Sequence, residues 1–112
     1  MASTSEAVLT QLRKGVLEYC VLACLRAKPS YGLELAARLH SSRLVASEGT
    51  VYPLLSRLRR QGLVETTWQE STSGPPRRYY QLTDAGIASL EAFVITWDPF
   101  STAVNAILEE VQ

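Results

Sequence analysis

The spacing of apolar residues changes twice along the chain, and these changes limit the folds open to it. Up to about residue 60 the apolar side chains recur every three or four positions, as in helices that bury one face. Residues 63–68 alternate in part and are rich in β-branched and aromatic side chains, as in a strand. Helical spacing returns after Thr83. The pattern predicts a mainly α, α+β fold in which three helices, a hairpin and a last helix follow one another. That order is typical of a winged helix-turn-helix with a two-stranded wing and a C-terminal dimerisation helix.

Local signals place the first two helices. We expect the first over residues 6–26, ended by Lys28 and Pro29, because the residue before a proline avoids helical backbone angles. The second is expected over residues 31–40, with the hydroxyl of Ser30 as its N-cap.

The third predicted helix carries the residues of a DNA-reading helix. It opens within residues 47–50 and ends at Gly62, a residue suited to the left-handed turn after a helix. Pro53 has no N–H to donate, so it fits either the first turn or a kink. A helix in the major groove presents hydroxyls and guanidiniums to bases and phosphates; a merely solvated face is the alternative. Opposite a buried stripe of Val51, Leu54, Leu55 and Leu58, the exposed candidates are Ser47, Thr50, Tyr52, Ser56, Arg57 and Arg60.

A turn segment at residues 71–76 separates two stretches with the character of paired strands, 63–68 and 77–82. Such a hairpin can lie along a phosphate backbone or enter the minor groove, and contacts of this kind position a protein on DNA. A charged hairpin edge also prevents unwanted strand pairing, and the two interpretations are compatible. The candidates are Ser73 and Gly74 in the turn, with Arg77 and Arg78 at the base of the hairpin.

The last predicted helix, capped by Thr83 or Asp84, carries an apolar seam too long for a small domain to cover. The seam steps by three and four alternately, as in a coiled coil, through Leu90, Phe93, Trp97, Phe100, Val104, Ile107 and Val111. A second subunit is the simplest cover, with Leu9, Leu12 and Val16 of the first helix as the partner stripe. Folding back onto the same domain is the alternative.

Two features modify this helix. Asp98 and Pro99 predict a kink, or a restart with Asp98 as a new cap. Trp97, with Phe93 and Phe100 in the same seam, can line an apolar cavity for a flat ligand at the dimer axis. Packing in the core is the simpler interpretation of the tryptophan.

Charge is unevenly distributed although its sum is zero. Basic residues concentrate between Thr10 and Gly62, whereas the chain after Thr83 contains acidic residues and no basic ones. One part of the molecule is therefore suited to phosphates. Double-stranded DNA is the predicted partner.

Metal binding and catalysis have little support. Cys20 and Cys24 lie four positions apart on a helix, but no other cysteine joins them and His40 is the single histidine. Packing explains such cysteines better than half of a metal site does. No Cys–His pair, paired carboxylates or phosphate-cradling glycine loop has a recognisable spacing. We predict no enzyme activity, no cofactor and no metal.

The N-terminus lacks the pattern of a secretory signal. No apolar run approaches the roughly 20 residues that span a bilayer. We therefore expect a cytoplasmic protein without membrane contact.

Four segments together resemble the PadR family of transcriptional regulators, in its short form with one C-terminal helix. They are residues 12–25, 30–35, 47–64 and 73–86, and they include the runs YGLEL, GTVYPLL and GPPRRYY. The resemblance implies a winged-helix homodimer that binds a palindromic operator, usually as a repressor. Some members release DNA when an aromatic or drug-like ligand binds.

The same resemblance assigns residues by position. It puts Thr50, Tyr52, Pro53 and Arg57 in the recognition helix, Tyr31 in the supporting helix, Arg77 and Arg78 in the wing, and Trp97 at a ligand pore between subunits. Pro99 departs from the unbroken last helix of the family. We predict a DNA-binding domain over residues 1–83 and a dimerisation helix over residues 84–112. A winged-helix module that binds only proteins is the alternative, and the basic helix and wing argue against it.

Overall fold

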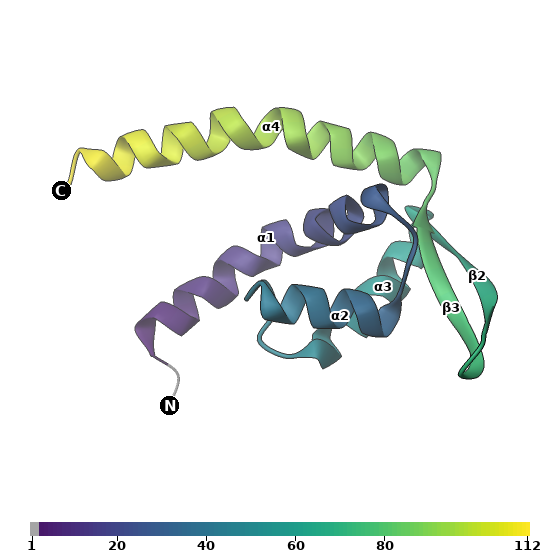
Figure 1. The fold of residues 1–112 in the computed structure, drawn as a ribbon. Coiled ribbons are helices and arrows are strands. Elements are labelled where there is room, and N and C mark those ends of the chain that lie inside the picture. The colour runs from purple at the N-terminus through teal and green to yellow at the C-terminus, as the bar shows by residue number, and fades with distance from the viewer. Residues whose placement is uncertain (1–2) are drawn as a thin grey trace.

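Three helices, a hairpin and a long last helix follow one another in the predicted order, with one short strand added (Figure 1). The computed structural model describes residues 3–112, so the first two residues of the predicted DNA-binding domain lie outside it. The elements are α1 (Thr4–Ala27), β1 (Ser30–Tyr31), α2 (Gly32–Ser41), the 3-10 helix η1 (Glu48–Thr50), α3 (Val51–Arg60), β2 (Val64–Ser71), β3 (Gly74–Leu82) and α4 (Asp84–Glu109). This is a winged helix-turn-helix, and the predicted fold class is confirmed.

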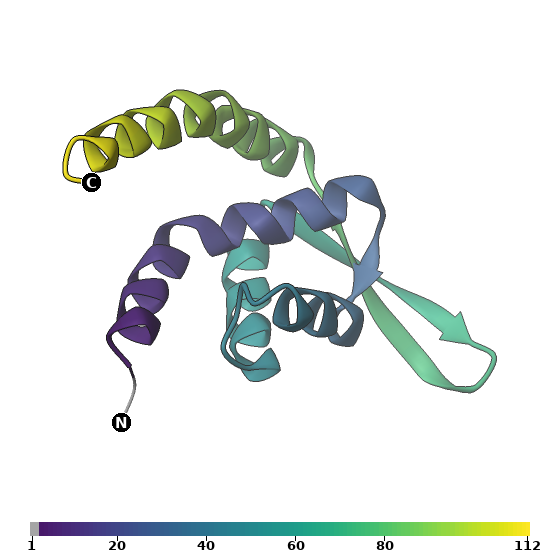
Figure 2. The ribbon, with the colours of Figure 1, turned by 60° about the vertical axis from the view of Figure 1, so that its left-hand side comes forward.

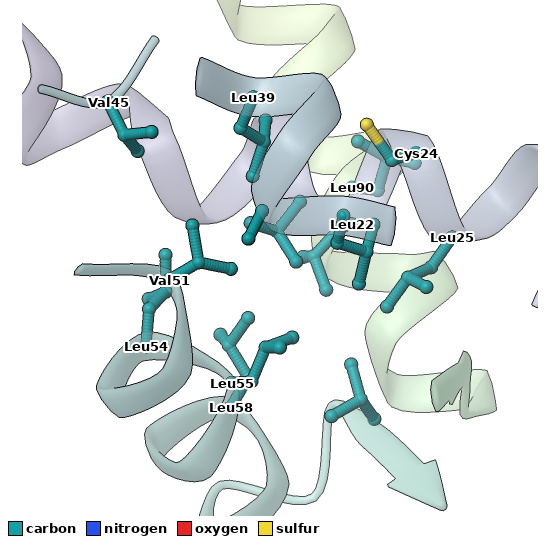
Figure 3. Packing of buried hydrophobic residues seen from close by; sticks show 14 residues of the cluster. Leu22, Cys24, Leu25, Leu39, Val45, Val51, Leu54, Leu55, Leu58 and Leu90 are labelled. Atoms are coloured by element: carbon teal, nitrogen blue, oxygen red, sulfur yellow. The ribbon is translucent and has the colours of Figure 1, made fainter. Parts of the chain in front are cut away.

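One apolar core holds the helices together (Figure 3). Leu22 of α1, Leu39 of α2 and Leu55 of α3 converge there, and α4 adds Leu90. Burying each such leucine contributes about 1.5–3 kcal/mol. The four stripe residues of α3 are all buried, as the helical spacing predicts: Val51, Leu54, Leu55 and Leu58.

The start of α2 differs from the prediction. Ser30 does not cap the helix; it is buried in β1, where it pairs with Tyr80 of β3. Tyr31 is the N-cap residue instead, and its side chain makes no capping hydrogen bond within residues 3–112. Ser30 lies next to Pro29 in extended backbone, which pairs with the sheet rather than turning directly into the helix.

The start and end of α3 agree with the sequence. The 3-10 turn η1 leads into the helix, and Pro53 falls in the first turn of α3, where no N–H is needed. Gly62 takes a φ of 75°, the left-handed conformation expected after the helix. The proline therefore fits the helix without a kink.

The sheet has three strands in the order β1-β3-β2, not two. The β2–β3 hairpin, here called the wing, is also longer than predicted. Its strands pair from Val64 and Leu82 out to Ser71 and Gly74, so the turn is shorter than residues 71–76. Pro75 and Pro76 are tolerated in β3 because the pairing is irregular there and β1 reaches only Tyr79 and Tyr80.

The N-terminus of α4 is fixed by the end of the wing. The Thr83 hydroxyl accepts a hydrogen bond from the Gly86 N–H at 3.1 Å, which confirms Thr83 as the cap, and it donates to the Gly62 carbonyl at 2.6 Å. Gly86 packs directly on the backbone of Leu63: a Cβ at this position would lie 2.1 Å from the Leu63 carbonyl oxygen. Only glycine fits this contact.

Pro99 does not restart α4, and Asp98 is not a new N-cap. The helix runs from Asp84 to Glu109 with a gentle curve (Figure 1). Pro99 removes one backbone donor to the carbonyl of Ile95, and both residues are exposed, so water can satisfy that carbonyl.

The last helix makes the molecule elongated. From the wing, α4 runs back along α1, which lies between it and α2 and α3 (Figures 1 and 2). The molecule measures 55 × 37 × 21 Å, and its radius of gyration of 16.2 Å exceeds the ~13 Å expected of a chain this long. The distal half of α4 thus extends beyond the core.

We expect Gly86→Ala to lower the free energy of unfolding by about 2 kcal/mol or more, because the new methyl group overlaps the Leu63 backbone. Gly15→Ala in α1 is the matched control, since beyond its own helix no heavy atom of residues 3–112 lies within 4 Å of its Cβ position. That change should stabilise by up to about 1 kcal/mol. Urea denaturation at one protein concentration measures both, and equal stabilities for the two variants would contradict the contact.

Candidate nucleic-acid interface

Two polar faces of α3 flank its buried stripe. Pro53 and Arg57, with Thr50 just before the helix, share one face by their spacing, and this face borders α1. Ser56 and Arg59 turn toward the wing. Each face borders a depression in the surface, and the side chain of Arg60 reaches both depressions.

The first depression, here called the α1–α3 groove, has a volume of about 690 Å³. Leu17, Leu44 and Leu54 contribute to its floor. Its charged lining residues are Arg13, Lys14 and Glu18 from α1 with Arg57 and Arg60 from α3.

Arg57 has an ionic partner in this groove. Its Nη2 lies 3.8 Å from Oε2 of Glu18, and the two side chains are 52% and 29% exposed. A pair this exposed contributes about 0.5 kcal/mol. A competing phosphate can therefore displace Glu18 at small cost.

The second depression, here called the α3–wing cleft, has a volume of about 360 Å³. It is lined by Ser56, Arg59 and Arg60 of α3 and by Arg78 and Tyr80 of β3. The guanidinium of Arg78 sits 4.9 Å from the ring centre of Trp68, its neighbour across the hairpin. This cation–π contact holds Arg78 in place beside α3.

Arg77 and Arg78 lie on opposite faces of the wing, because successive residues of a strand alternate. Arg77 stacks over the ring of Tyr31 at 4.4 Å, and that ring meets Tyr79 edge-on at 5.5 Å. Neither arginine lies at the base of the hairpin as expected; they pair with Gln69 and Trp68, midway along it. The reason is the length of the strands, which continue to Gly74.

Other candidates are placed around the start of α3 and at the wing tip. Tyr52 lies against the first residue of α2, with its ring 2.9 Å from a Cβ built on Gly32. The Thr50 hydroxyl donates to the Ser47 carbonyl at 2.8 Å, so this hydroxyl supports the local turn. Ser73 and Gly74 are exposed at the wing tip.

Arg59 was not among the residues expected at the interface, and Arg13 and Lys14 had no expected role. The signal for Arg59 was available: Ser56 and Arg59 are three positions apart, which puts them on one helix face. The role of the α1 residues depends on which helix faces α3, and helical spacing alone does not specify that.

An aromatic cluster joins α1 to α4. Tyr19 stacks on Phe93 with ring centres 4.4 Å apart, and Phe93 stacks on Trp97 at 5.6 Å. The residues predicted for the dimer interface differ in exposure. Leu90 lies in the core of its own chain. Beyond the aromatic cluster the apolar seam of α4 is exposed at Phe100, Val104 and Ile107. Val111, predicted to continue the seam, is also exposed but lies after the helix, which ends at Glu109. On α1, Leu12 is exposed, while Leu9 and Val16 are half-buried.

The two cysteines are free thiols. Burial raises the pKa of Cys24, and Arg38 offsets part of this shift. Burial also raises the pKa of Cys20, with a smaller contribution from Cys24. Both thiols therefore stay protonated at neutral pH. Within residues 3–112, no group of three or more His, Cys, Asp or Glu side chains gathers to hold a metal ion.

No helix in the described part of the chain combines the length and apolar content needed to cross a membrane. Together, the fold and the arginines on both flanks of α3 define the class: a winged-helix protein with a basic third helix.

Comparisons with known proteins identify the family. The model of the "Transcriptional regulator PadR-like family" matches residues 21–92. A PadR-like transcriptional regulator from Bacillus cereus is 42% identical, with 88% of this chain and 96% of that chain covered and a TM-score of 0.80. A PadR family transcriptional regulator from Eggerthella lenta is 34% identical, with 94% and 92% covered and a TM-score of 0.80.

Bacillus subtilis PadR, solved in complex with operator DNA, shares the fold at 24% identity, with 71% of this chain and 47% of that chain covered and a TM-score of 0.64. The chain therefore belongs to the PadR-like family of transcriptional regulators, as its motifs predict. This is a family of regulators rather than of enzymes.

Proposed function

We propose that this protein is a repressor that binds double-stranded DNA as a homodimer, with α3 in the major groove and the wing on the adjacent backbone. The observation that carries the proposal is that arginines lie on both sides of α3. Arg57 and Arg60 line the α1–α3 groove, and Arg60 lines the α3–wing cleft together with Arg78 of β3. Phosphate contacts of this kind fix the register of a protein on DNA. Tyr52, Pro53 and Ser56 are exposed on α3, where they can reach base edges or the backbone.

The arginines of the wing divide between two roles. Arg78 faces α3 and contributes a phosphate contact, whereas Arg77 stacks on Tyr31 on the other face. We therefore assign the electrostatic share of the affinity to Arg57, Arg60 and Arg78. This share weakens as salt rises, because phosphate contacts release condensed counterions.

The exposed seam of α4 supports the homodimer. Phe100 and Ile107 of α4 are each more than half exposed in the single chain, as are Leu12 of α1 and Val111 just after α4. Exposed apolar stripes at coiled-coil spacing are buried most simply by a second copy of the same helix. Residue 83 then separates the DNA-binding domain from the dimerisation helix that we propose.

Two-fold symmetry determines the shape of the operator. A symmetric dimer presents two copies of α3, so its target is a palindrome whose half-sites lie about 34 Å apart, one helical turn. A dimer bound across a promoter blocks transcription, which is the basis of the proposed repression. Selection of bound duplexes from a random pool tests both the binding and the symmetry.

Arg57→Ala should lower the affinity of the dimer for the selected duplex roughly a hundredfold, because one charge-assisted phosphate contact, worth about tenfold, is lost in each subunit. The dimer should remain intact. Arg26→Ala is the matched control, since Arg26 pairs with Glu91 of α4 on the other side of α1 from α3. Gel-shift titration at fixed salt measures both, and wild-type affinity of the Arg57 variant would count against the assigned contact.

Phe100→Glu should convert the protein to a monomer, because a carboxylate cannot be buried in an apolar seam without a partner. Phe100 is 61% exposed in the single chain, so the folded protomer should tolerate the change. Leu33→Glu on α2, at a side chain 58% exposed, is the control and should remain dimeric. Sedimentation velocity gives the masses, and circular dichroism confirms the helix content. A dimeric Phe100 variant would refute the α4 interface.

An aromatic ligand is the proposed effector that releases the DNA. Tyr19, Phe93 and Trp97 form a stacked cluster whose outer member is 43% exposed, and Phe100 is exposed one turn further on. Residues Glu18 and Tyr19 are neighbours on α1, one paired with Arg57 of α3 and the other stacked on α4. A ligand that moves the cluster therefore moves the helix that faces Arg57. Release follows if the ligand binds the DNA-free form better.

Tryptophan fluorescence tests the effector site. The chain has two tryptophans, so Trp68→Phe leaves Trp97 as the only reporter. Flat aromatic ligands should quench it saturably and release DNA over the same concentration range. In the control variant Trp97→Phe, the same ligands should leave the emission of Trp68 unchanged. Quenching of Trp97 without DNA release would show that the cluster binds ligands but does not control DNA binding.

A further inference from the structure

We propose that the α3–wing cleft is a binding site for a single phosphate group, with Arg59, Arg60 and Arg78 as its ligands. The inference rests on the proposed DNA function, because the natural source of the phosphate would be the DNA backbone. It adds Arg59 as a binding residue and gives the wing a defined point of contact.

The charge of the cleft is uncompensated. Three guanidiniums from two elements line it, and none of its lining residues within the described chain is acidic. The ion pairs found among residues 3–112 engage Arg26, Lys28 and Arg57, not the arginines of this cleft. Like charges held together in this way repel one another until an anion is bound.

Arg78 supplies a second, independent observation. Its Nε atom is buried and has no hydrogen-bond partner among residues 3–112. A buried donor without an acceptor costs free energy. An anion oxygen can reach this donor only when the side chain shifts to expose the Nε–H, and the bond that then forms would remove the cost.

The backbone brings these donors together before any ligand arrives. Ser56, Arg59 and Arg60 are spaced three and four apart on α3, which places them on adjoining faces of the helix. Arg78 and Tyr80 are two apart on β3 and so share one face of the wing. Trp68 holds the Arg78 guanidinium from beneath at 4.9 Å.

The place of the cleft favours a phosphate over a carboxylate. In the proposed complex α3 enters the major groove and the wing lies on the adjacent backbone. The sugar–phosphate strand at the edge of the groove then lies next to both elements, where the cleft lies. The guanidinium fork matches the oxygens of a phosphate, and the hydroxyls of Ser56 and Tyr80 can donate as well.

The test is a salt titration of DNA affinity with Arg59→Gln, Arg78→Gln and the double variant, using the selected duplex and an unrelated one. Each single variant should weaken both duplexes by the same factor, about a hundredfold, because a contact worth about tenfold is lost in each of the two subunits. The slope of log K against log salt should fall by about 1.8, which is 0.9 for the one phosphate lost at each of the two subunits. The double variant should lose little more, because both arginines serve one group. Arg77→Gln, on the opposite face, is the control and should keep the wild-type slope.

Several outcomes overturn the proposal. Unchanged slopes would mean that the cleft holds no phosphate. A slope that falls by twice as much in the double variant would mean two separate phosphates. A change in base preference would make Arg59 or Arg78 a base-reading residue, and an equal effect of Arg77→Gln would indicate a general effect of wing charge.

The source of the phosphate is distinguished by following the Nε–H resonance of Arg78 in the 15N-labelled wild-type dimer. The duplex should shift it strongly, and inorganic phosphate weakly at millimolar concentration. If phosphate shifts the resonance while no duplex binds, the cleft binds phosphate and the proposed DNA function is refuted. If duplexes bind and neither addition moves the resonance, DNA binding is supported and the proposed phosphate site is refuted.

Discussion

Packing of the α3 stripe against α1 and α2 sets the rotation of this helix about its own axis. With Val51, Leu54, Leu55 and Leu58 buried, every other residue of α3 must lie on a flank or on the outer face. One flank meets α1 and the other meets the wing, so the helix itself distributes its arginines between two depressions. If the apolar residues of α3 were shifted by one position, the helix would pack with a different rotation. Arg57 would then turn away from Glu18, and Arg59 away from Arg78. The core therefore determines the geometry of the interface as well as its stability.

Helix α1 contacts both the proposed DNA-binding face of α3 and the aromatic cluster on α4. Its residue Glu18 contacts α3, its neighbour Tyr19 contacts α4, and α1 lies between these helices in both views (Figures 1 and 2). Well-packed interiors transmit displacements rather than absorb them. A change in how α4 packs can thus reach Arg57 through a single helix. The exposed ion pair is suited to this role, because an interaction of about 0.5 kcal/mol shifts readily between two arrangements.

Much of the fold could be predicted because its signals are local. Helical spacing gave the buried stripe of α3, and single residues such as Gly62 and Thr83 marked where elements end. The two-residue strand β1 could not be found, since two residues show no period and its partner Tyr80 lies far along the chain. The opposite placement of Arg77 and Arg78 follows from alternation, but which of them faces α3 depends on the register between β2 and β3. Arg59 shares a helix face with Ser56, but only the packing of the wing against that face shows that it borders a cleft.

A net charge of zero is compatible with DNA binding because part of the negative charge lies far from α3, compared with the range of its field. At physiological salt that range is about 8 Å, whereas the molecule is 55 Å long. Acidic residues such as Asp98 and Glu109 lie on the distal half of α4, separated by α1 from α3 and the wing (Figure 1). In the proposed complex, a duplex on α3 would be attracted by the arginines and screened from these distal carboxylates. The same arrangement would turn α4 away from the duplex and leave its apolar seam free for the proposed second subunit.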